Sequence, residues 1–309
     1  MKLAVLFAGQ GAQVKDMGLD FINLNSTLKT LAEEISKYLD FDFIHLLSDE
    51  EKINDTRYTQ PLMIGVEILI YEYLKKMGLK PDGFTGFSLG EYAALYASGI
   101  YDIPSIMKLI DYRAQLMSEV SKTTQGKMAA ILGLEDTLVD EVCKVISNET
   151  EIVVAANFNS SHQTVISGSE KAVLTAIEVL KEKGAKRALL LNVSGAFHSP
   201  YMKESGIKLR VFGNDFKRNP IQTPLYKNTD ANRLKDEEVL DEIEKQIYSP
   251  VYFKQTIEQM VIDGYTHFLE IGPGSVLTSL VKKINPDLIT FNVSKVEDIE
   301  KIKGVLWWF

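Results

Sequence analysis

Residues 83–99, GFTGFSLGEYAALYASG, decide the fold of this chain, because they place a strand, a sharp turn and a helix in immediate succession. The stretch that ends at Phe87 predicts a strand, and residues 91–98 predict a helix that closes at Gly99. Between them Ser88 lies in the pattern Gly-x-Ser-x-Gly. Glycines at these positions permit a strained serine backbone and a close approach of strand and helix. The stretch therefore predicts a nucleophile elbow in an α/β protein.

The same serine has a second interpretation. A serine that follows a glycine turn and precedes a helix is a common N-cap, whose side-chain oxygen accepts a hydrogen bond from the first helical turn. In the catalytic interpretation, the amide groups and the dipole at the helix N-terminus would stabilise an oxyanion beside Ser88. The five-residue pattern favours neither interpretation over the other, so the rest of the chain has to decide.

A nucleophilic serine needs a general base, and the chain has four histidines. His267 lies in an apolar strand, and His45 lies in or beside an amphipathic helix, so a structural or packing role is expected for both. His162 lies in a polar turn. His198 lies in a loop at a predicted domain junction, where clefts form. We therefore expect His198 to be the base.

The chain as a whole alternates between β-type and helical runs, which predicts a mostly parallel sheet. Strands are expected at residues 3–7, 83–87 and 266–271, and helices at residues 61–77 and 104–120. The middle segment instead follows the order of a ferredoxin-like unit. Its elements are expected at residues 127–132, 135–146, 152–156, 163–167, 169–183 and 187–191. We therefore predict a catalytic α/β domain of residues 1–125 and 193–309. A ferredoxin-like small domain of residues 126–192 is inserted between hinges at Gly126 and Val193-Ser194-Gly195.

Composition narrows the possible functions. The chain has 309 residues, 45% of them hydrophobic, which is enough for a sizeable core. The single cysteine, Cys143, excludes a disulfide framework and a multi-thiolate metal site, and its helical setting predicts packing. The start of the sequence lacks a signal-peptide pattern, and no apolar run reaches the roughly 18 residues of a membrane span. We expect a soluble, cytoplasmic protein. Its net charge of −8 argues against nucleic-acid binding.

Arg113 interrupts the apolar stripe of the helix at residues 104–120. A guanidinium that faces the core is always charged and must find a partner. A structural ion pair with an acidic side chain would satisfy it. A second possibility is a bidentate seat for a ligand carboxylate, which an acyl group that carries an acid would supply.

Six features of the sequence, in the same order, resemble the malonyl-CoA:acyl carrier protein transacylase family. They cover most of the chain and comprise GQGAQ at 9–13, GFSLGEY at 86–92, Arg113, GAFH at 195–198, QIYSPV at 246–251 and EIGPG at 270–274. The resemblance implies a hydrolase-like, mostly parallel sheet core with an inserted ferredoxin-like α+β small domain. It also implies an S-malonyltransferase that uses coenzyme A and acyl carrier protein as substrate and partner, with no cofactor, metal, nucleic acid or membrane.

The resemblance further implies a mechanism. Ser88 attacks the malonyl thioester with His198 as general base, and the backbone amides of Gln10 and Leu89 form the oxyanion hole. Arg113 holds the malonyl carboxylate. A malonyl-serine ester forms, coenzyme A leaves, and the phosphopantetheine thiol of the carrier protein takes the malonyl group in a ping-pong scheme.

Some positions refine or depart from the family pattern. The resemblance implies that a backbone carbonyl near Gln246 orients His198, so that a dyad is expected rather than a triad. Phe87 replaces the usual elbow histidine, and Gly195 replaces the first histidine of a HAFH-type motif. Phe197, the bulky residue linked with malonyl selection, is retained. Asn157 and Asn159 match an asparagine-containing stretch that faces the family's cleft, although a turn-forming asparagine pair explains them equally well.

Acyl carrier proteins are acidic, so an enzyme of net charge −8 needs a local basic patch to meet one. Either of two runs is a candidate for this patch, although charge runs are commonly just solvated faces. The first run, near His198, comprises Lys203, Lys208, Arg210, Lys217 and Arg218. The second, on the small domain, comprises Lys181, Lys183, Lys186 and Arg187.

Four functions compete on these residues. Malonyl transfer for fatty acid synthesis is the first, and a stand-alone malonyl acyltransferase of a polyketide synthase is the second. An acyl hydrolase is a third, which Arg113 disfavours because this arginine rewards a carboxylate. A non-catalytic carrier-protein binding module is the fourth, which intact Ser88 and His198 disfavour.

Overall fold

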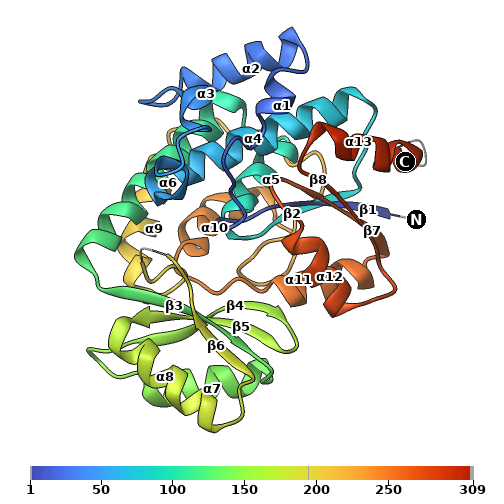
Figure 1. The fold of residues 1–309 in the computed structure, drawn as a ribbon. Helices are drawn as coiled ribbons and strands as arrows, with labels where there is room; N and C mark the ends of the chain where they lie inside the picture. The colour runs from blue at the N-terminus through green and yellow to red at the C-terminus, as the bar shows by residue number, and fades with distance from the viewer. Residues whose placement is uncertain (1, 194, 307–309) are drawn as a thin grey trace.

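The computed structural model describes residues 2–193 and 195–306, which form two sheets (Figure 1). The larger sheet has four parallel strands in the order β2-β1-β7-β8, namely Gly83–Gly86, Lys2–Phe7, Tyr265–Ile271 and Ile289–Val293. The smaller sheet is antiparallel in the order β4-β5-β3-β6, namely Val153–Ser160, Gln163–Ser169, Gly126–Leu132 and Arg187–Leu190. The predicted α/β fold with a parallel core and a small α+β unit is confirmed. Ser194 of the expected hinge lies outside the described residues.

Helices cover both faces of the larger sheet, as a parallel sheet with two apolar faces requires (Figure 1). Strand β1 divides the core by alternation: Leu3, Val5 and Phe7 face one cluster, and Ala4 and Leu6 face the other. The first cluster is covered mainly by α1 (Leu19–Ile22), α2 (Ser26–Ser36), α3 (Phe43–Leu46), α4 (Thr56–Lys76), α5 (Glu91–Ala97), α6 (Ile103–Thr123), α9 (Lys203–Gly213), α10 (Val239–Gln246) and α13 (Ile299–Leu306). The second is covered by α11 (Phe253–Ile262) and α12 (Val276–Ile284). Five 3₁₀ turns are described: η1 (Lys52–Asn54), η2 (Ser88–Gly90), η3 (Pro200–Met202), η4 (Asp236–Glu238) and η5 (Val296–Asp298).

The small sheet carries its own core on one face. Helices α7 (Asp136–Ile146) and α8 (Glu170–Glu182) pack on the face turned away from the larger sheet (Figure 1). At the edge of this sheet β4 is bonded to a loop of the large unit, through Phe158 N to Val251 O at 2.9 Å and Val251 N to Ala156 O at 2.8 Å. An ion pair between Lys254 and Asp136 joins α11 to α7. These contacts seat the small sheet beside the carboxyl ends of β1 and β2. The domain boundaries themselves stay a prediction.

Several details differ from the sequence-based expectations. Strand β8 was not predicted, because all of its residues except Val293 are half-buried or exposed at a sheet edge. Helix α4 begins at Thr56 rather than at Pro61, because Asp55 is the N-cap and accepts a hydrogen bond from Arg57 N. The packing role expected for His45 is wrong, since its side chain is exposed on α3. Cys143 is buried, as expected.

Candidate active site

The elbow forms where β2 ends and α5 begins. Ser88 has a φ of +52°, in the left-handed region that few residues other than glycine adopt. A Cβ on Gly86 would lie 2.0 Å from Gly90 C, and one on Gly90 would lie 2.2 Å from Phe7 O. Only glycine fits at either position, so the two motif glycines let the strand and helix close around a strained serine.

His198 faces this serine. Its Nε2 lies 2.6 Å from Ser88 Oγ, and its Nδ1 lies 3.0 Å from Gln246 O and 3.1 Å from Ser249 O. Carbonyl oxygens only accept, so Nδ1 carries the proton and Nε2 accepts from the serine hydroxyl. His198 is oriented by backbone carbonyls, which is the arrangement of a dyad. This pairing also sets Ser88 apart from a simple N-cap, since η2 has no side-chain cap.

Burial makes His198 a neutral base. The imidazole lies in a dry site beside a cation, and burial followed by the charge of Arg113 lowers the pKa of His198 to about 4. The two carbonyl acceptors oppose this shift without cancelling it. At neutral pH the imidazole is therefore unprotonated and able to take a proton from Ser88.

Arg113 is fully buried on α6 in the same site. Its Nη1 donates to Gln60 Oε1 at 2.7 Å and its Nη2 donates to Gln246 Oε1 at 3.2 Å, and its guanidinium lies 5.1 Å from the centre of the Tyr92 ring. Burial lowers the pKa of Arg113, yet a guanidinium stays charged at neutral pH. Among the described residues, no acidic side chain forms an ion pair with it. The cation is thus held by neutral groups and keeps its charge for a ligand.

Gln246 connects these three residues. Its side-chain Nε2 donates to Ser88 O at 2.5 Å, its Oε1 accepts from Arg113, and its backbone carbonyl accepts from His198. One residue at the end of α10 thereby fixes the nucleophile, the base and the buried cation relative to one another.

The loop after β1 lies against the elbow. A Cβ on Gly9 would lie 2.6 Å from Phe87 O, so the loop has to pass close to the elbow backbone. The side chain of Gln10 donates to Thr56 Oγ1 at 2.9 Å, which fixes the loop to the start of α4. Leu89 follows the serine in η2. Gln10 and Leu89 therefore lie on two segments that pass close together at Phe87, and the role of their amides as oxyanion donors stays a prediction.

The structure shows which residues surround Phe87 and Gly195, the two positions that depart from the family pattern. Phe87 packs edge-on against Phe253 at 5.4 Å between ring centres, so an apolar contact replaces a polar side chain beside the nucleophile. A Cβ on Gly195 would lie 2.3 Å from Ser121 Oγ, so this position has no room for a histidine. Phe197 is buried and packs against the larger core.

The other candidate residues from the sequence lie in different settings. Asn157 and Asn159 are buried on β4, where Asn157 pairs with Val251, so they do not form an exposed turn. His267 is buried on β7, and His162 is an exposed turn residue near Glu135. Neither lies in the site of Ser88.

Sequence reasoning missed two residues of the site. Gln60 binds Arg113 from an apolar helix, and a fully buried glutamine on such a helix is a signal that could have been used. Asn228 binds the elbow backbone from a loop that carries no periodic pattern, so no signal in a single sequence points to it.

An elbow serine bonded to a neutral histidine, beside amides and a buried cation, defines a serine acyl-transfer enzyme on an α/β fold. The sequence profile of the acyl transferase domain family matches residues 5–300. The malonyl CoA-acyl carrier protein transacylase of Staphylococcus aureus is 38% identical over 302 residues, covering 97% of each chain. The chain belongs to the acyl transferase domain family and, within it, to the malonyl-CoA:acyl carrier protein transacylases.

Solved structures agree with this assignment. An acyl carrier protein S-malonyltransferase from Vibrio cholerae matches with a TM-score of 0.94 and 36% identity, covering 98% of this chain and 100% of that one. A malonyl-transacylase in complex with the acyl-carrier protein of a type II polyketide synthase also matches at 0.94, with 33% identity and coverage of 99% and 100%.

Proposed function

We propose that the chain is an S-malonyltransferase, which moves a malonyl group from coenzyme A to the phosphopantetheine thiol of acyl carrier protein through a malonyl-Ser88 ester. One observation carries the proposal: the buried cation Arg113 and the Ser88–His198 dyad share one site and one partner, Gln246. A nucleophile beside a guanidinium that has no acidic partner among the described residues suits an acyl group with its own carboxylate.

The first half-reaction forms the ester. Ser88 Oγ attacks the thioester carbonyl carbon as His198 Nε2 takes the hydroxyl proton. The amides of Gln10 and Leu89 stabilise the charge on the carbonyl oxygen. When the tetrahedral intermediate collapses, the carbon–sulfur bond breaks, and the imidazolium returns its proton to the departing thiolate of coenzyme A.

The second half-reaction reverses the roles. The carrier thiol gives its proton to His198 and attacks the ester carbonyl, and the carbon–oxygen bond to Ser88 breaks as the proton returns to Oγ. Both thiols thus pass through one site in turn. A cavity of about 380 Å³ beside Gln10, lined also by Ser118 and Asn192, offers a path for the pantetheine arm.

Selectivity follows from the site walls. Arg113 binds the malonyl carboxylate by a charge-assisted pair, which acetyl groups cannot form. Phe197 fills space beside the base and disfavours the extra methyl of methylmalonyl. The chain's own groups supply nucleophile, base and charge stabilisation, so the proposed reaction needs no cofactor, and malonyl-CoA is a substrate.

We propose fatty acid synthesis as the pathway and the cytoplasm as the location. No described helix is long and apolar enough to cross a membrane. The relative in complex with a polyketide carrier protein supports a polyketide synthase as the alternative pathway. Turnover with carrier proteins of the two pathways, both from the source organism, separates them.

Intact mass measurement after incubation with malonyl-CoA tests the proposed function. The wild type should gain one malonyl group, and Ser88→Ala should gain none. Parallel incubation with methylmalonyl-CoA and acetyl-CoA should give slower adduct formation. No adduct on the wild type, or an adduct that survives Ser88→Ala, refutes the proposal. Fast release of free malonate without carrier protein would instead favour a hydrolase.

A further inference from the structure

The strained backbone of Ser88 needs an external support. A φ of +52° at a serine costs free energy and persists only where surrounding contacts determine it. Gln246 holds the carbonyl of this residue, and His198 binds its hydroxyl. These two contacts leave the amide side of the residue, where the chain turns out of β2, to be held by another group.

Asn228 holds that side. Ser88 N donates to Asn228 Oδ1 at 2.7 Å, and Asn228 Nδ2 donates to Gly86 O at 2.7 Å. A donor on one side and an acceptor on the other fix the orientation of the carboxamide. The side chain is buried, so water does not compete for either bond. Asn228 thus bridges the two residues that flank Phe87.

A segment that runs beside β2 brings Asn228 to this position. Residues 224–226 run beside Phe84, with Phe84 N donating to Pro224 O at 2.8 Å and Tyr226 N donating to Phe84 O at 2.9 Å. Thr85 Oγ1 donates to Tyr226 O at 3.0 Å. Two residues further on, Asn228 comes level with the elbow.

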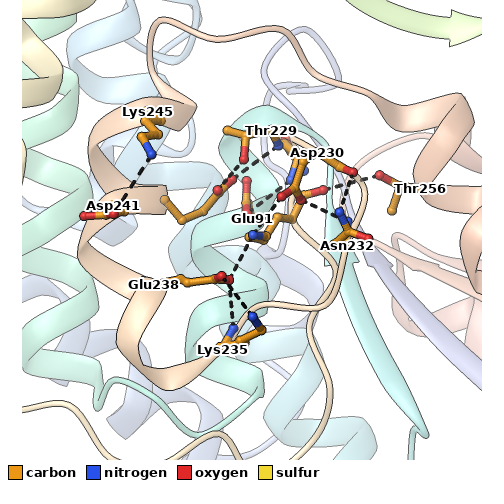
Figure 2. A network of polar contacts seen from close by, with 12 residues as sticks. Glu91, Thr229, Asp230, Asn232, Lys235, Glu238, Asp241, Lys245 and Thr256 are labelled. Atoms are coloured by element: carbon orange, nitrogen blue, oxygen red, sulfur yellow. Dashed lines mark hydrogen bonds and ion pairs between the residues drawn. The ribbon is translucent and has the colours of Figure 1, made fainter.

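A pair of buried carboxyl groups fixes the backbone around Asn228. Glu91, at the start of α5, accepts from Asn228 N at 3.4 Å, and Glu242 accepts from Thr229 N at 3.4 Å and from Thr229 Oγ1 at 2.5 Å. Figure 2 shows Glu91 and Thr229 among the residues of this polar network. Burial, and then the neighbouring Glu242, raise the pKa of Glu91 well above its usual value. On the other side, Tyr252 N donates to Asn228 O at 2.9 Å.

We infer that Asn228 is a positioning residue of the transfer reaction, which holds Ser88 in the left-handed conformation that points its hydroxyl at His198. The inference rests on the proposed function for its substrate, and on the elbow geometry for its mechanism. Because Asn228 occupies the amide of Ser88, that amide is not an oxyanion donor. This is compatible with the proposed donors, the amides of Gln10 and Leu89.

The test measures the reactivity of Ser88 itself. A fluorophosphonate probe reacts by forming an Oγ–P bond, losing fluoride and passing the serine proton to His198, so its rate reports nucleophile geometry without any acyl substrate. Asn228→Ala should label to one probe per chain but about 10²-fold more slowly, as expected for a small misplacement of a reacting group. Malonyl-serine formation at saturating malonyl-CoA should slow by a similar factor, with little change in KM.

A matched control lies in the same loop. Asn232 is exposed, and its hydrogen bonds with other described residues stay within the loop, to Asp230 and through its carbonyl to Lys227 N, so Asn232→Ala should label at the wild-type rate. Asn228→Asp serves as a second, nearly isosteric variant. It keeps an acceptor for Ser88 N but places a carboxylate against Gly86 O, and it should also label more slowly.

The outcomes are distinct. Folded Asn228 variants that label at the wild-type rate overturn the inference, whatever their melting temperature. Failure of both variants to fold assigns Asn228 to folding and overturns it equally. If the Asn228 variants label slowly with the probe but the wild type forms no malonyl adduct, the inference stands and the proposed substrate is refuted.

Discussion

At the scale of single residues, the site works because burial acts on His198 and Arg113 in opposite ways. The imidazole responds to burial by losing its proton, and the guanidinium keeps its charge because it cannot lose one under ordinary conditions. The same dry pocket therefore holds a neutral base and a permanent cation, each oriented by Gln246. Transfer of an acid-bearing acyl group needs both.

The first prediction concerns pH. His198 must be neutral to act, and its pKa is about 4 rather than the usual 6.5, so kcat/KM for malonyl-CoA should fall only as the pH drops towards 4. A bound malonyl carboxylate offsets the charge of Arg113 and raises the pKa of His198, so the acidic limb of kcat should lie at higher pH than that of kcat/KM. Rate profiles at constant ionic strength measure both. An acidic limb of kcat/KM near 6.5 in the wild type contradicts the prediction.

The second prediction concerns Arg113. Replacing it by alanine removes charge-assisted hydrogen bonds worth about 1.5–3 kcal/mol, which lowers the preference for malonyl over acetyl roughly 10- to 150-fold. The same change removes a positive charge near His198 and should move the acidic limb of kcat/KM upward. Competition between malonyl-CoA and acetyl-CoA, read by intact mass, gives the preference. Arg113→Lys should recover it only in part, because an ammonium cannot form the planar bidentate pair. An unchanged preference in Arg113→Ala refutes the assigned role.

Single residues also mark the limit of what the sequence predicts. Ser88, His198 and Arg113 were found because motif, spacing and an interrupted apolar stripe mark them. Asn228 carries no such mark: its role depends on a loop that runs beside β2, more than a hundred residues away in the sequence. The departure from the family pattern at Gly195 is likewise explained only by a residue near it in space, because Ser121 leaves no room for a side chain.

At the scale of elements, patterning predicted all described strands except β8, but it predicted fewer than half of the described helices. Pro61 resembles a first helical residue, but the true N-cap is Asp55, and α4 tolerates the proline near its start. Strand β8 is short, and at the sheet edge its residues Ile289–Phe291 are only half-buried or exposed, so it lacks the buried apolar run of β1. The elbow was predicted correctly because its glycines answer a steric demand that no other residue meets.

The third prediction tests that demand. Gly86→Ala would put a Cβ 2.0 Å from the backbone of Gly90, so α5 must shift away from β2. We expect a loss of about 1–3 kcal/mol or more in the free energy of unfolding, together with slower labelling of Ser88. Gly304→Ala is the control: its Cβ meets nothing within 4 Å, and a helical alanine should leave stability unchanged or raise it by about 0.5–1 kcal/mol. Urea unfolding measures both changes, and equal stability of the two variants would contradict the steric argument.

At the scale of the whole molecule, the site forms where two sheets meet. The larger sheet presents the carboxyl ends of β1 and β2, the edge at which α/β proteins bind ligands. The small sheet lies next to this edge, and its strand β4 is bonded to Val251 of the larger unit. Ser88 and His198, 110 residues apart in sequence, come together only through this assembly, which is why a single sequence does not show their geometry.

The molecule's charge distribution bears on the carrier protein. In the basic run near His198, Arg210 is paired with Asp241 and Glu244, and Arg218 donates to the carbonyls of Gly213 and Phe216. In the second run, Lys183, Lys186 and Arg187 are exposed, and no ion pair joins them to other described residues. The strand that starts at Arg187 leads directly to Asn192 at the cavity beside Gln10. Lys203 and Lys208 of the first run are also exposed and have no ion pair with described residues, so position beside this cavity, and not free charge, favours the second run.

The fourth prediction follows from this difference. Reversing Lys183, Lys186 and Arg187 to glutamate should raise the KM for acyl carrier protein about tenfold and flatten its dependence on salt, because rim charges act mainly on association. Reversing Lys203 and Lys208 should have a much smaller effect. Because both variants keep Ser88, His198 and Arg113, transfer of malonyl to free pantetheine, which carries no acidic surface, should stay close to wild type in each. Unchanged carrier kinetics in both variants would show that neither run docks the carrier. A loss with pantetheine as acceptor would place the defect in the catalytic site instead of the docking surface.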